Sequence, residues 1–310
     1  MDNNMGKSNI AGRGGNRMKR NRKVKRSAGK IMIYVLLVFF AIVFTLPFYW
    51  SVLTSFRPNS EIFSAGINLL PTSVTTEHYV RAFQVIPFLR YSINTLFITV
   101  MIIATNLIFC SLAGYAFAKL QFFGRKVIYR IMLISVMVPG TVLMIPQFLI
   151  LARFPLVGGN NILGQGGHGF SGNFMGVILP TAISVFNILF MRSFYISMPD
   201  ELGEAARIDG AGELKTFFRV YVPLSKPALA TLSVFCFQAG WNSFMWPSII
   251  LRSGEFKVLS QGLQSFVVNN NVDYGPMMAA AVCAMLPVII VFMFAQKYFI
   301  EGIAFSGTKS

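Results

Sequence analysis

Charged residues are scarce in this chain, and cysteine and histidine are scarcer still. Asp, Glu, Lys and Arg make up 12% of the 310 residues and hydrophobic residues 55%, whereas a typical globular domain is about 25% charged. This composition excludes an intrinsically disordered chain. Three cysteines are also too few for a disulfide-stapled secreted domain. The length would fit about two soluble domains, but the composition predicts a polytopic membrane protein.

Six long stretches of the sequence contain no charged residue. A helix needs about 20 apolar residues to cross a bilayer core about 30 Å thick, so these stretches are the expected membrane spans. The uncharged stretches are residues 31–56, 91–118, 131–152, 154–191, 227–251 and 274–296. The fourth is too long for one helix, and its span is placed at about 174–195. The expected fold class is therefore all-α: a polytopic membrane protein with six transmembrane helices.

A glycine-rich segment, VGGNNILGQGGHGFSGN at residues 157–173, precedes the fourth span without any charge to separate them. In lipid it would leave backbone groups without hydrogen-bond partners, so we expect it outside the membrane. A flexible connector and a docking surface for another protein both fit this segment.

Basic residues are divided unevenly between the two sides of the expected spans. One side, which includes both termini, has 21 of the Lys and Arg residues, and the other side has 6. By the positive-inside rule both termini are cytoplasmic. The basic run at residues 17–26 also fits an arm for nucleic acid or anionic lipid. A solvated tail that sets the orientation is the simpler interpretation, and we expect no nucleic-acid partner.

The uncharged stretches offer none of the Asp, Glu, Lys or Arg side chains that ion-coupled transporters usually need at membrane depth. No phosphate-binding loop is present either, so energy for active transport would have to come from another subunit. His78 and His168 fall in different outer loops, and the three cysteines fall inside apolar helices. We therefore expect no catalytic residue and no metal site.

The loop after the fourth span is the most distinctive polar segment, with five of the chain's eleven acidic residues. Its pattern predicts short helices over residues 201–208 and 213–221, separated by a break at residues 209–212. Pro223 and Pro227 are expected to end the second helix. A solvated loop, a helix-turn-helix reader of DNA and a docking site for a cytoplasmic protein all fit this arrangement, but a loop tied to the membrane at both ends suits DNA poorly.

A family pattern is present in this loop. Glu204-Ala205-Ala206, Gly210 and Val220-Tyr221-Val222-Pro223 resemble the EAA loop of ABC importer permeases, whose pattern is E-A-A-x3-G-x9-I-x-L-P. Valine replaces isoleucine at 220 and leucine at 222. The segments 204–227, 241–247 and 296–302 are similar to the carbohydrate-uptake branch of that family. From residue 31 onward the chain resembles the second permease of a maltose-type pair.

The resemblance implies a permease subunit of an ATP-driven importer in the bacterial plasma (inner) membrane. Its partners would be a second permease chain in a heterodimer, two cytoplasmic ATPase subunits that hold ATP and Mg, and an extracellular sugar-binding protein. No cofactor would be bound by this chain. The EAA loop would be the helix that enters the ATPase, and its coupling residues would be Glu204, Ala205, Ala206, Asp209, Gly210 and Pro223.

The domain organisation expected is a basic cytoplasmic tail at residues 1–30, a permease domain at 31–302 with the coupling loop at 196–226, and a cytoplasmic tail at 303–310. The outer loops at 57–90, 153–173 and 252–276 would face the binding protein. The third of these resembles the family's loop that reaches into that protein to help displace the sugar.

Sugar sites combine aromatic faces with amides and hydroxyls, but buried amides in membranes commonly hold helices together instead. Either role fits the polar and aromatic residues at membrane depth, which are candidates for the substrate path: Asn94, Asn106, Asn187, Gln238, Trp241, Asn242 and Trp246. Alternatives to a sugar permease are an ABC permease for another solute and an ATP-independent channel or facilitator. An integral-membrane enzyme fits less well.

Overall fold

The computed structural model describes the backbone of residues 8–63, 70–268 and 271–307, and the side chains of residues 30–63, 70–268 and 271–297. The first half of the described chain forms α1 (Ser8–Ser55), α2 (Asn59–Ile62), α3 (Glu77–Val85), α4 (Phe88–Lys119), α5 (Arg125–Val136), α6 (Gly140–Ala152), α7 (Phe174–Thr181) and α8 (Val185–Ile196). The second half forms α9 (Glu201–Ile208), α10 (Glu213–Thr216), the π-helix η1 (Phe217–Tyr221), α11 (Val222–Leu224), α12 (Lys226–Trp241), α13 (Met245–Ile250), α14 (Leu259–Gln264), the strands β1 (Val267–Val268) and β2 (Asn271–Val272), and α15 (Tyr274–Gly307).

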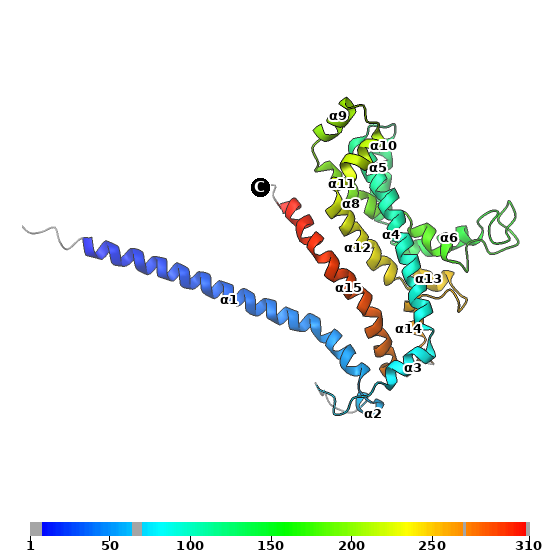
Figure 1. Cartoon of the computed structure of the whole chain (residues 1–310), viewed down its shortest axis with the longest axis horizontal. Coiled ribbons are helices and arrows are strands. Elements are labelled where there is room, and N and C mark those ends of the chain that lie inside the picture. The colour runs from blue at the N-terminus through cyan, green and yellow to red at the C-terminus, as the bar shows by residue number, and fades with distance from the viewer. Residues whose placement is uncertain (1–7, 64–69, 269–270, 308–310) are drawn as a thin grey trace, which may run out of the picture.

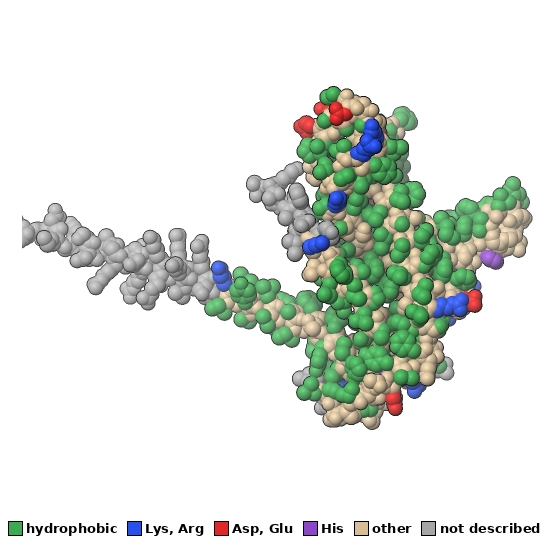
Figure 2. All heavy atoms as spheres, viewed as in Figure 1, with side chains coloured by type: hydrophobic (Ala, Val, Ile, Leu, Met, Phe, Trp, Pro, Cys, Tyr) green, Lys and Arg blue, Asp and Glu red, His purple; other side chains and the backbone are tan. Residues whose placement is uncertain are grey.

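Most of the expected spans are present as long apolar helices. Within the described residues, four segments are long and apolar enough to cross a membrane, at Lys30–Ser55, Phe88–Lys119, Phe174–Ile196 and Tyr274–Lys297. Two bent helix pairs raise the number of spans to six if each pair is one span. The all-α polytopic fold is therefore confirmed. In Figure 2, hydrophobic side chains cover the middle of the molecule, and the acidic side chains in view lie at the top, at the lower end and at the right-hand edge.

The first helix stands apart from the others. In Figure 1, α1 approaches the remaining helices near its C-terminal end and diverges from them towards its N-terminus. The apolar part of its span is not buried at all within the chain. Because α1 begins at Ser8, most of the segment expected to be a tail is helical backbone continuous with the first span. Residues 1–7 and 308–310, which belong to the two expected tails, lie outside the described residues.

The third span is not the straight helix expected over residues 131–152. Helices α5 and α6 meet at an angle of 108°. Pro139 lies between them and has no N–H to donate, and a residue that precedes a proline is driven out of the helical region. The side chains on both sides of this bend are exposed, including Met137 and Ile145.

The fifth span, expected as one helix over residues 227–251, is also interrupted. Helix α12 ends at Trp241, and α13 begins again at Met245 after a short non-helical link. At its other end, α12 meets the α10–α11 segment at 83°. Ser225, completely buried, lies at this second bend.

Close backbone contacts hold the centre of the bundle together. A Cβ on Gly114 of α4 would lie 2.7 Å from Cβ of Met191 on α8, and one on Gly240 of α12 would lie 3.0 Å from Oγ1 of Thr99 on α4. Glycine at these positions therefore lets α4 pack directly on both α8 and α12.

The loops and short helices at the end of the molecule opposite α9, the lower end of Figure 1, also contact α4. Asn94 donates hydrogen bonds to the backbone oxygens of Glu255 (3.0 Å) and Lys257 (2.8 Å), and Thr95 Oγ1 accepts one from the backbone N–H of Leu259 (2.8 Å). His78 is buried there, with Nε2 2.6 Å from the backbone oxygen of Arg57. It is therefore a structural residue within this segment, whereas His168 is exposed.

The glycine-rich segment 157–173 is folded on itself, with hydrogen bonds between its two sides. Asn160 donates to the backbone oxygens of Ala152 and Phe154 and accepts from the N–H of Gly167. A Cβ on Gly167 would lie 2.2 Å from the oxygen of Gly158, so the two sides of the loop are in backbone contact. In Figure 1 this loop projects sideways from the bundle between α6 and α7.

Candidate functional site

Helix α9 lies at one end of the molecule, on the loop that contains the EAA pattern (Figure 1). Its C-terminal end is a Schellman motif: the N–H of Ala211 bonds to the oxygen of Ala206 (2.9 Å), and that of Gly210 to the oxygen of Arg207 (3.0 Å). Gly210 has a φ of +75°, which a residue without Cβ adopts readily. The sequence pattern thus corresponds to a helix followed by a left-handed turn.

The two sides of α9 face different surroundings. Glu204, Ala205 and Asp209 are exposed, whereas Gly203 and Ala206 are buried against the rest of the chain. A Cβ on Gly203 would lie 3.1 Å from the hydroxyl of Tyr221. The small residues therefore let α9 pack on its own protein, and only Ala205 of the alanine pair is exposed for a partner.

An ion pair ties the start of this loop to the bundle. Nζ of Lys119, the last residue of α4, donates to Oδ1 of Asp200 and to the backbone oxygen of Met198, both at 2.6 Å. The ammonium of Lys119 holds the pKa of Asp200 below its usual range. The loop is therefore attached to α4 just before α9 begins.

A second attachment follows α9. The hydroxyl of Tyr115 on α4 donates to Oε2 of Glu213 (2.8 Å), and Nε of Arg207 donates to Oε1 of the same carboxylate (3.0 Å). Glu213 thus bridges α9 and α4 with both its oxygens. Sequence inspection did not single out Tyr115 or Lys119, because neither lies in the loop.

The segment after Glu213 forms an aromatic core rather than a simple amphipathic helix. The ring of Tyr115 lies 5.2 Å from that of Phe217 and 4.9 Å from that of Tyr221, between ring centroids. Phe217 is buried while Leu214 and Phe218 are exposed, so the three do not share one buried face. The chain continues as a π-helical turn over Phe217–Tyr221, which rotates the residues that follow it relative to an α-helix.

Pro223 does not end the second helix as expected. It lies inside α11, at one of the first positions of that helix, where a missing N–H costs little. The chain turns instead at Ser225, two residues later. Pro223 is exposed, as are the apolar residues Ile208, Leu214 and Phe218 on the same loop. A group of exposed apolar side chains is typical of a protein-binding surface.

A cleft of about 750 Å³ opens between α4, α7, α8 and α12, and it contains four of the residues expected on the substrate path: Asn106, Asn187, Gln238 and Asn242. Asn106 uses its amide within the protein: Nδ2 donates to the oxygens of Ile102 and Thr181, and Oδ1 accepts from Nδ2 of Asn187 (2.8 Å) and from the thiol of Cys110. Nδ2 of Asn187 also lies 3.4 Å from Sγ of Cys236.

Three amides of the cleft keep groups available for a ligand. Oδ1 of Asn187 and the side-chain amides of Gln238 and Asn242 have no hydrogen-bond partner among the described residues, and the last two side chains are exposed. The cleft therefore presents donors and acceptors together with apolar surface, which suits a hydroxyl-bearing solute.

The other three expected path residues make hydrogen bonds within the protein. Asn94 binds the 255–257 segment, Nε1 of Trp241 donates to the oxygen of Ala284 (3.1 Å), and Nε1 of Trp246 donates to the oxygen of Gly176 (3.1 Å). All three are buried. Such bonds are those by which buried amides and indoles hold helices together, which is the second role considered for these residues. Among the described residues, no group of three or more His, Cys, Asp or Glu could hold a metal ion.

A bundle of apolar helices with an exposed helical loop at one end and an amide-lined cleft between its helices defines a membrane transport subunit. Residues 110–304 match the family described as the binding-protein-dependent transport system inner membrane component. The chain belongs to this family. It is a multi-pass permease rather than an enzyme, and it works with a partner permease, separate ATPase subunits and a binding protein.

Similar proteins cover almost the whole chain. The arabinooligosaccharides transport system permease protein AraQ of Halalkalibacterium halodurans is 31% identical over 92% of this chain and 100% of its own length. The maltodextrin transport system permease protein MdxG of Bacillus subtilis is 33% identical over 93% and 99%. A chain of a bacterial ABC transporter that imports the polysaccharide alginate is 30% identical, with a TM-score of 0.75 over 87% of this chain and 95% of that one.

Proposed function

We propose that this chain is the permease subunit of an ATP-driven importer for a sugar or oligosaccharide delivered by an extracellular binding protein. The names of the relatives support the solute class, since arabinooligosaccharides and maltodextrin are both carbohydrates. The chain would form the translocation pathway with a different permease chain. ATP and Mg would be held by the two ATPase subunits, and this chain would bind no cofactor.

The observation that carries the proposal is α9, held at both ends to α4 with an outward face of Glu204, Ala205 and Asp209. In this proposal that face enters a cleft of the ATPase, where Glu204 pairs with a basic residue. Gly210 supplies the turn that ends the helix. Ala206 contributes by packing α9 on its own chain, and Pro223 lies at the edge of the same surface.

The distribution of basic residues supports an orientation with both termini and α9 in the cytoplasm. The loops at 57–90, 153–173 and 252–276 then face the binding protein. The amides of Asn187, Gln238 and Asn242 would contact the solute in the cleft. Asn106 would position Asn187, and Asn94, Trp241 and Trp246 would support the surrounding helices.

The first experiment is to purify the tagged chain after mild solubilisation and to identify the bound proteins by mass spectrometry. We expect an ATPase and a second permease. Glu204→Lys should abolish ATPase recovery and sugar uptake, because it places a cation opposite the basic residue expected on the partner. The second permease should still be recovered, which shows that the variant inserts and assembles.

Arg219→Glu provides a control of reversed charge at another exposed position of the same loop. It should retain the ATPase. Recovery of the chain alone, with ATP-independent sugar flux in liposomes, would instead identify a facilitator. Recovery of an ATPase together with a binding protein that retains no carbohydrate would refute a carbohydrate as the transported solute. It would leave the proposed coupling of α9 to the ATPase unaffected.

A further inference from the structure

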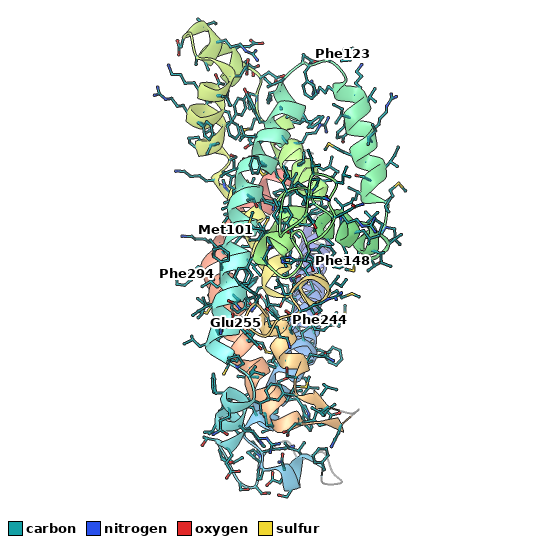
Figure 3. The ribbon with its side chains drawn as sticks, turned by 90° about the vertical axis from the view of Figure 1, so that its right-hand side faces the viewer. Met101, Phe123, Phe148, Phe244, Glu255 and Phe294 are labelled. Atoms are coloured by element: carbon teal, nitrogen blue, oxygen red, sulfur yellow. The ribbon has the colours of Figure 1, made fainter. Side chains whose placement is uncertain are left out.

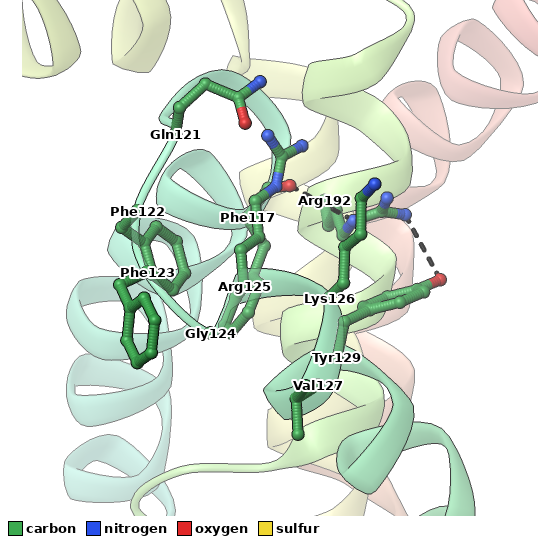
Figure 4. A pocket seen from close by; sticks show the side chains of 10 residues that line it. All are labelled: Phe117, Gln121, Phe122, Phe123, Gly124, Arg125, Lys126, Val127, Tyr129 and Arg192. Carbon is green, nitrogen blue, oxygen red and sulfur yellow. Dashed lines mark hydrogen bonds between the residues drawn. The ribbon is translucent and has the colours of Figure 1, made fainter.

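A pocket of about 590 Å³ lies beside the short loop that joins α4 to α5 (Figure 4). Arg125 and Lys126 reach it from the start of α5, and Arg192 reaches it from α8. Among the described residues that line the pocket, none is acidic. Three cations therefore face one cavity without a carboxylate to balance them.

The cations are positioned to different degrees. Arg192 is fixed, because its Nε donates to the oxygen of Phe117 (3.3 Å), its Nη1 donates to the hydroxyl of Tyr129 (3.2 Å), and its guanidinium lies 4.1 Å from the centroid of the Tyr129 ring. Arg125 donates to the backbone oxygens of Leu120 and Ala118 at the end of α4. Lys126 is exposed and makes no hydrogen bond or ion pair with any described residue.

The start of α5 adds positive charge of its own. The helix begins directly at Arg125, and its first turn contains no acidic residue. The N-terminus of a helix has a partial positive charge and favours anions, so Arg125 and Lys126 are placed where cations are least stable. An anion with several acceptor oxygens would neutralise both the side chains and the helix end.

The surroundings of the pocket are those of a membrane interface. Phe123 is completely exposed and Phe122 is 39% exposed, and both lie among the residues that line the pocket. Val127 and Ile128 continue this exposed apolar surface along α5. Figure 3 shows Phe123 at the same end of the molecule as α9 but across the bundle from it, so the pocket is separate from the ATPase-coupling surface.

We propose that this pocket binds the phosphate of an anionic phospholipid, with Arg192 and Lys126 on the phosphate oxygens and the acyl chains along the apolar side of α5. The phosphate chemistry would also fit a free anion. The adjoining exposed phenylalanines and α5 favour a lipid, because basic pockets at the cytoplasmic ends of membrane helices bind anionic head groups. The site concerns this chain's own residues and does not depend on the identity of the transported solute.

The test uses the complete transporter in nanodiscs of phosphatidylcholine with increasing phosphatidylglycerol, followed by native mass spectrometry to count the phosphatidylglycerol molecules retained. We expect one tightly retained phosphatidylglycerol per copy of this chain. Lys126→Gln should weaken its retention about fivefold, as should Arg192→Gln, because each removes one cation near the head group. Lys126 is exposed and makes no hydrogen bond or ion pair with the described residues, so its variant should keep the fold even if Arg192→Gln does not.

Arg130→Gln is the matched control: it removes the same charge from α5 four residues later, outside the pocket. It should leave lipid retention unchanged. Equal losses for Lys126→Gln and Arg130→Gln would overturn the site in favour of general charge attraction. Complete displacement of the lipid by inorganic phosphate would assign the pocket to a soluble anion, and loss of the ATPase in Lys126→Gln would assign it to a protein partner.

Discussion

Gly210 combines a left-handed backbone with an open position, since a Cβ added there would meet no atom within 4 Å. A side chain at 210 would therefore be opposed by the backbone conformation and not by crowding. A left-handed conformation costs most L-residues about 1–2 kcal/mol, whereas Asn adopts it more readily.

We expect Gly210→Val to reduce uptake strongly and Gly210→Asn to retain most of it. Valine strains the turn that ends α9, and asparagine, which is of similar size, fits it better. Sugar uptake by cells that express each variant at equal levels measures the difference. An equal loss of uptake in both variants would show that a partner occupies the space around Gly210. The volume of the side chain, and not the backbone conformation, would then determine the effect.

Tyr115→Phe should loosen the coupling loop without altering its outer face. The substitution removes the hydroxyl that donates to Glu213, a hydrogen bond to a charged group worth about 1.5–3 kcal/mol. We expect the ATPase to remain bound while the sugar transported per ATP falls. Tyr91→Phe on the same helix is the control, because its hydroxyl has no hydrogen-bond partner among the described residues. Unchanged stoichiometry in Tyr115→Phe would refute a positioning role for this bond.

At the level of single residues, the sequence predicts local features that are determined by residues close by in the chain. The Gly210 turn follows the acidic and small residues of α9 by a fixed spacing, so the end of the helix was predictable. The partner of Glu213 was not, because Tyr115 lies 98 positions earlier. His78 shows the same limit: its burial depends on Arg57 and on α15, and nothing in its local sequence indicates it.

At the level of secondary-structure elements, the contact of α4 with α8 depends on the absence of one side chain. The Cβ of an alanine at 114 would lie within 2.9 Å of the backbone nitrogen of Arg192, an atom that cannot move without shifting α8. We expect Gly114→Ala to destabilise the protein by about 1–3 kcal/mol. Thermal unfolding of the purified protein in detergent measures this, and Gly140→Ala, with no atom within 4 Å, is the matched control. Equal unfolding temperatures in the two variants would contradict the packing assigned to α4 and α8.

The spans were predictable as elements because their length and lack of charge are local properties. Whether each span is a straight helix could not be predicted in the same way. The 108° bend between α5 and α6 has a local signal, Pro139 followed by Gly140, but such a pair also occurs in kinked helices that continue in one direction. The glycine-rich loop was correctly excluded from the spans, yet its fold depends on the amide of Asn160, which contacts both sides of the loop.

At the scale of the whole molecule, the orientation predicts which surface residues meet which compartment. Phe123 and Ile162 are both exposed, and they lie on opposite sides of the membrane in the proposed topology. A membrane-impermeant maleimide applied to intact cells should label Ile162→Cys and not Phe123→Cys, and inverted vesicles should give the reverse. The native Cys110 and Cys236 are buried and should contribute little background, and the partly exposed Cys283 is replaced by Ala in both variants. Labelling of Phe123→Cys in intact cells would show that the true topology is the inverse of the proposed one.

Helix α4 is attached at one end to the coupling loop through Tyr115 and Lys119, and at the other to the 255–259 segment through Asn94 and Thr95. Its 32 residues span about 48 Å. A rigid rod of that length acts as a lever: a tilt of about 10° moves the far end by about 8 Å relative to the pivot. Movement of α9 can therefore reach the opposite side of the membrane as the swing of a single helix, with no relay of side-chain rearrangements in between.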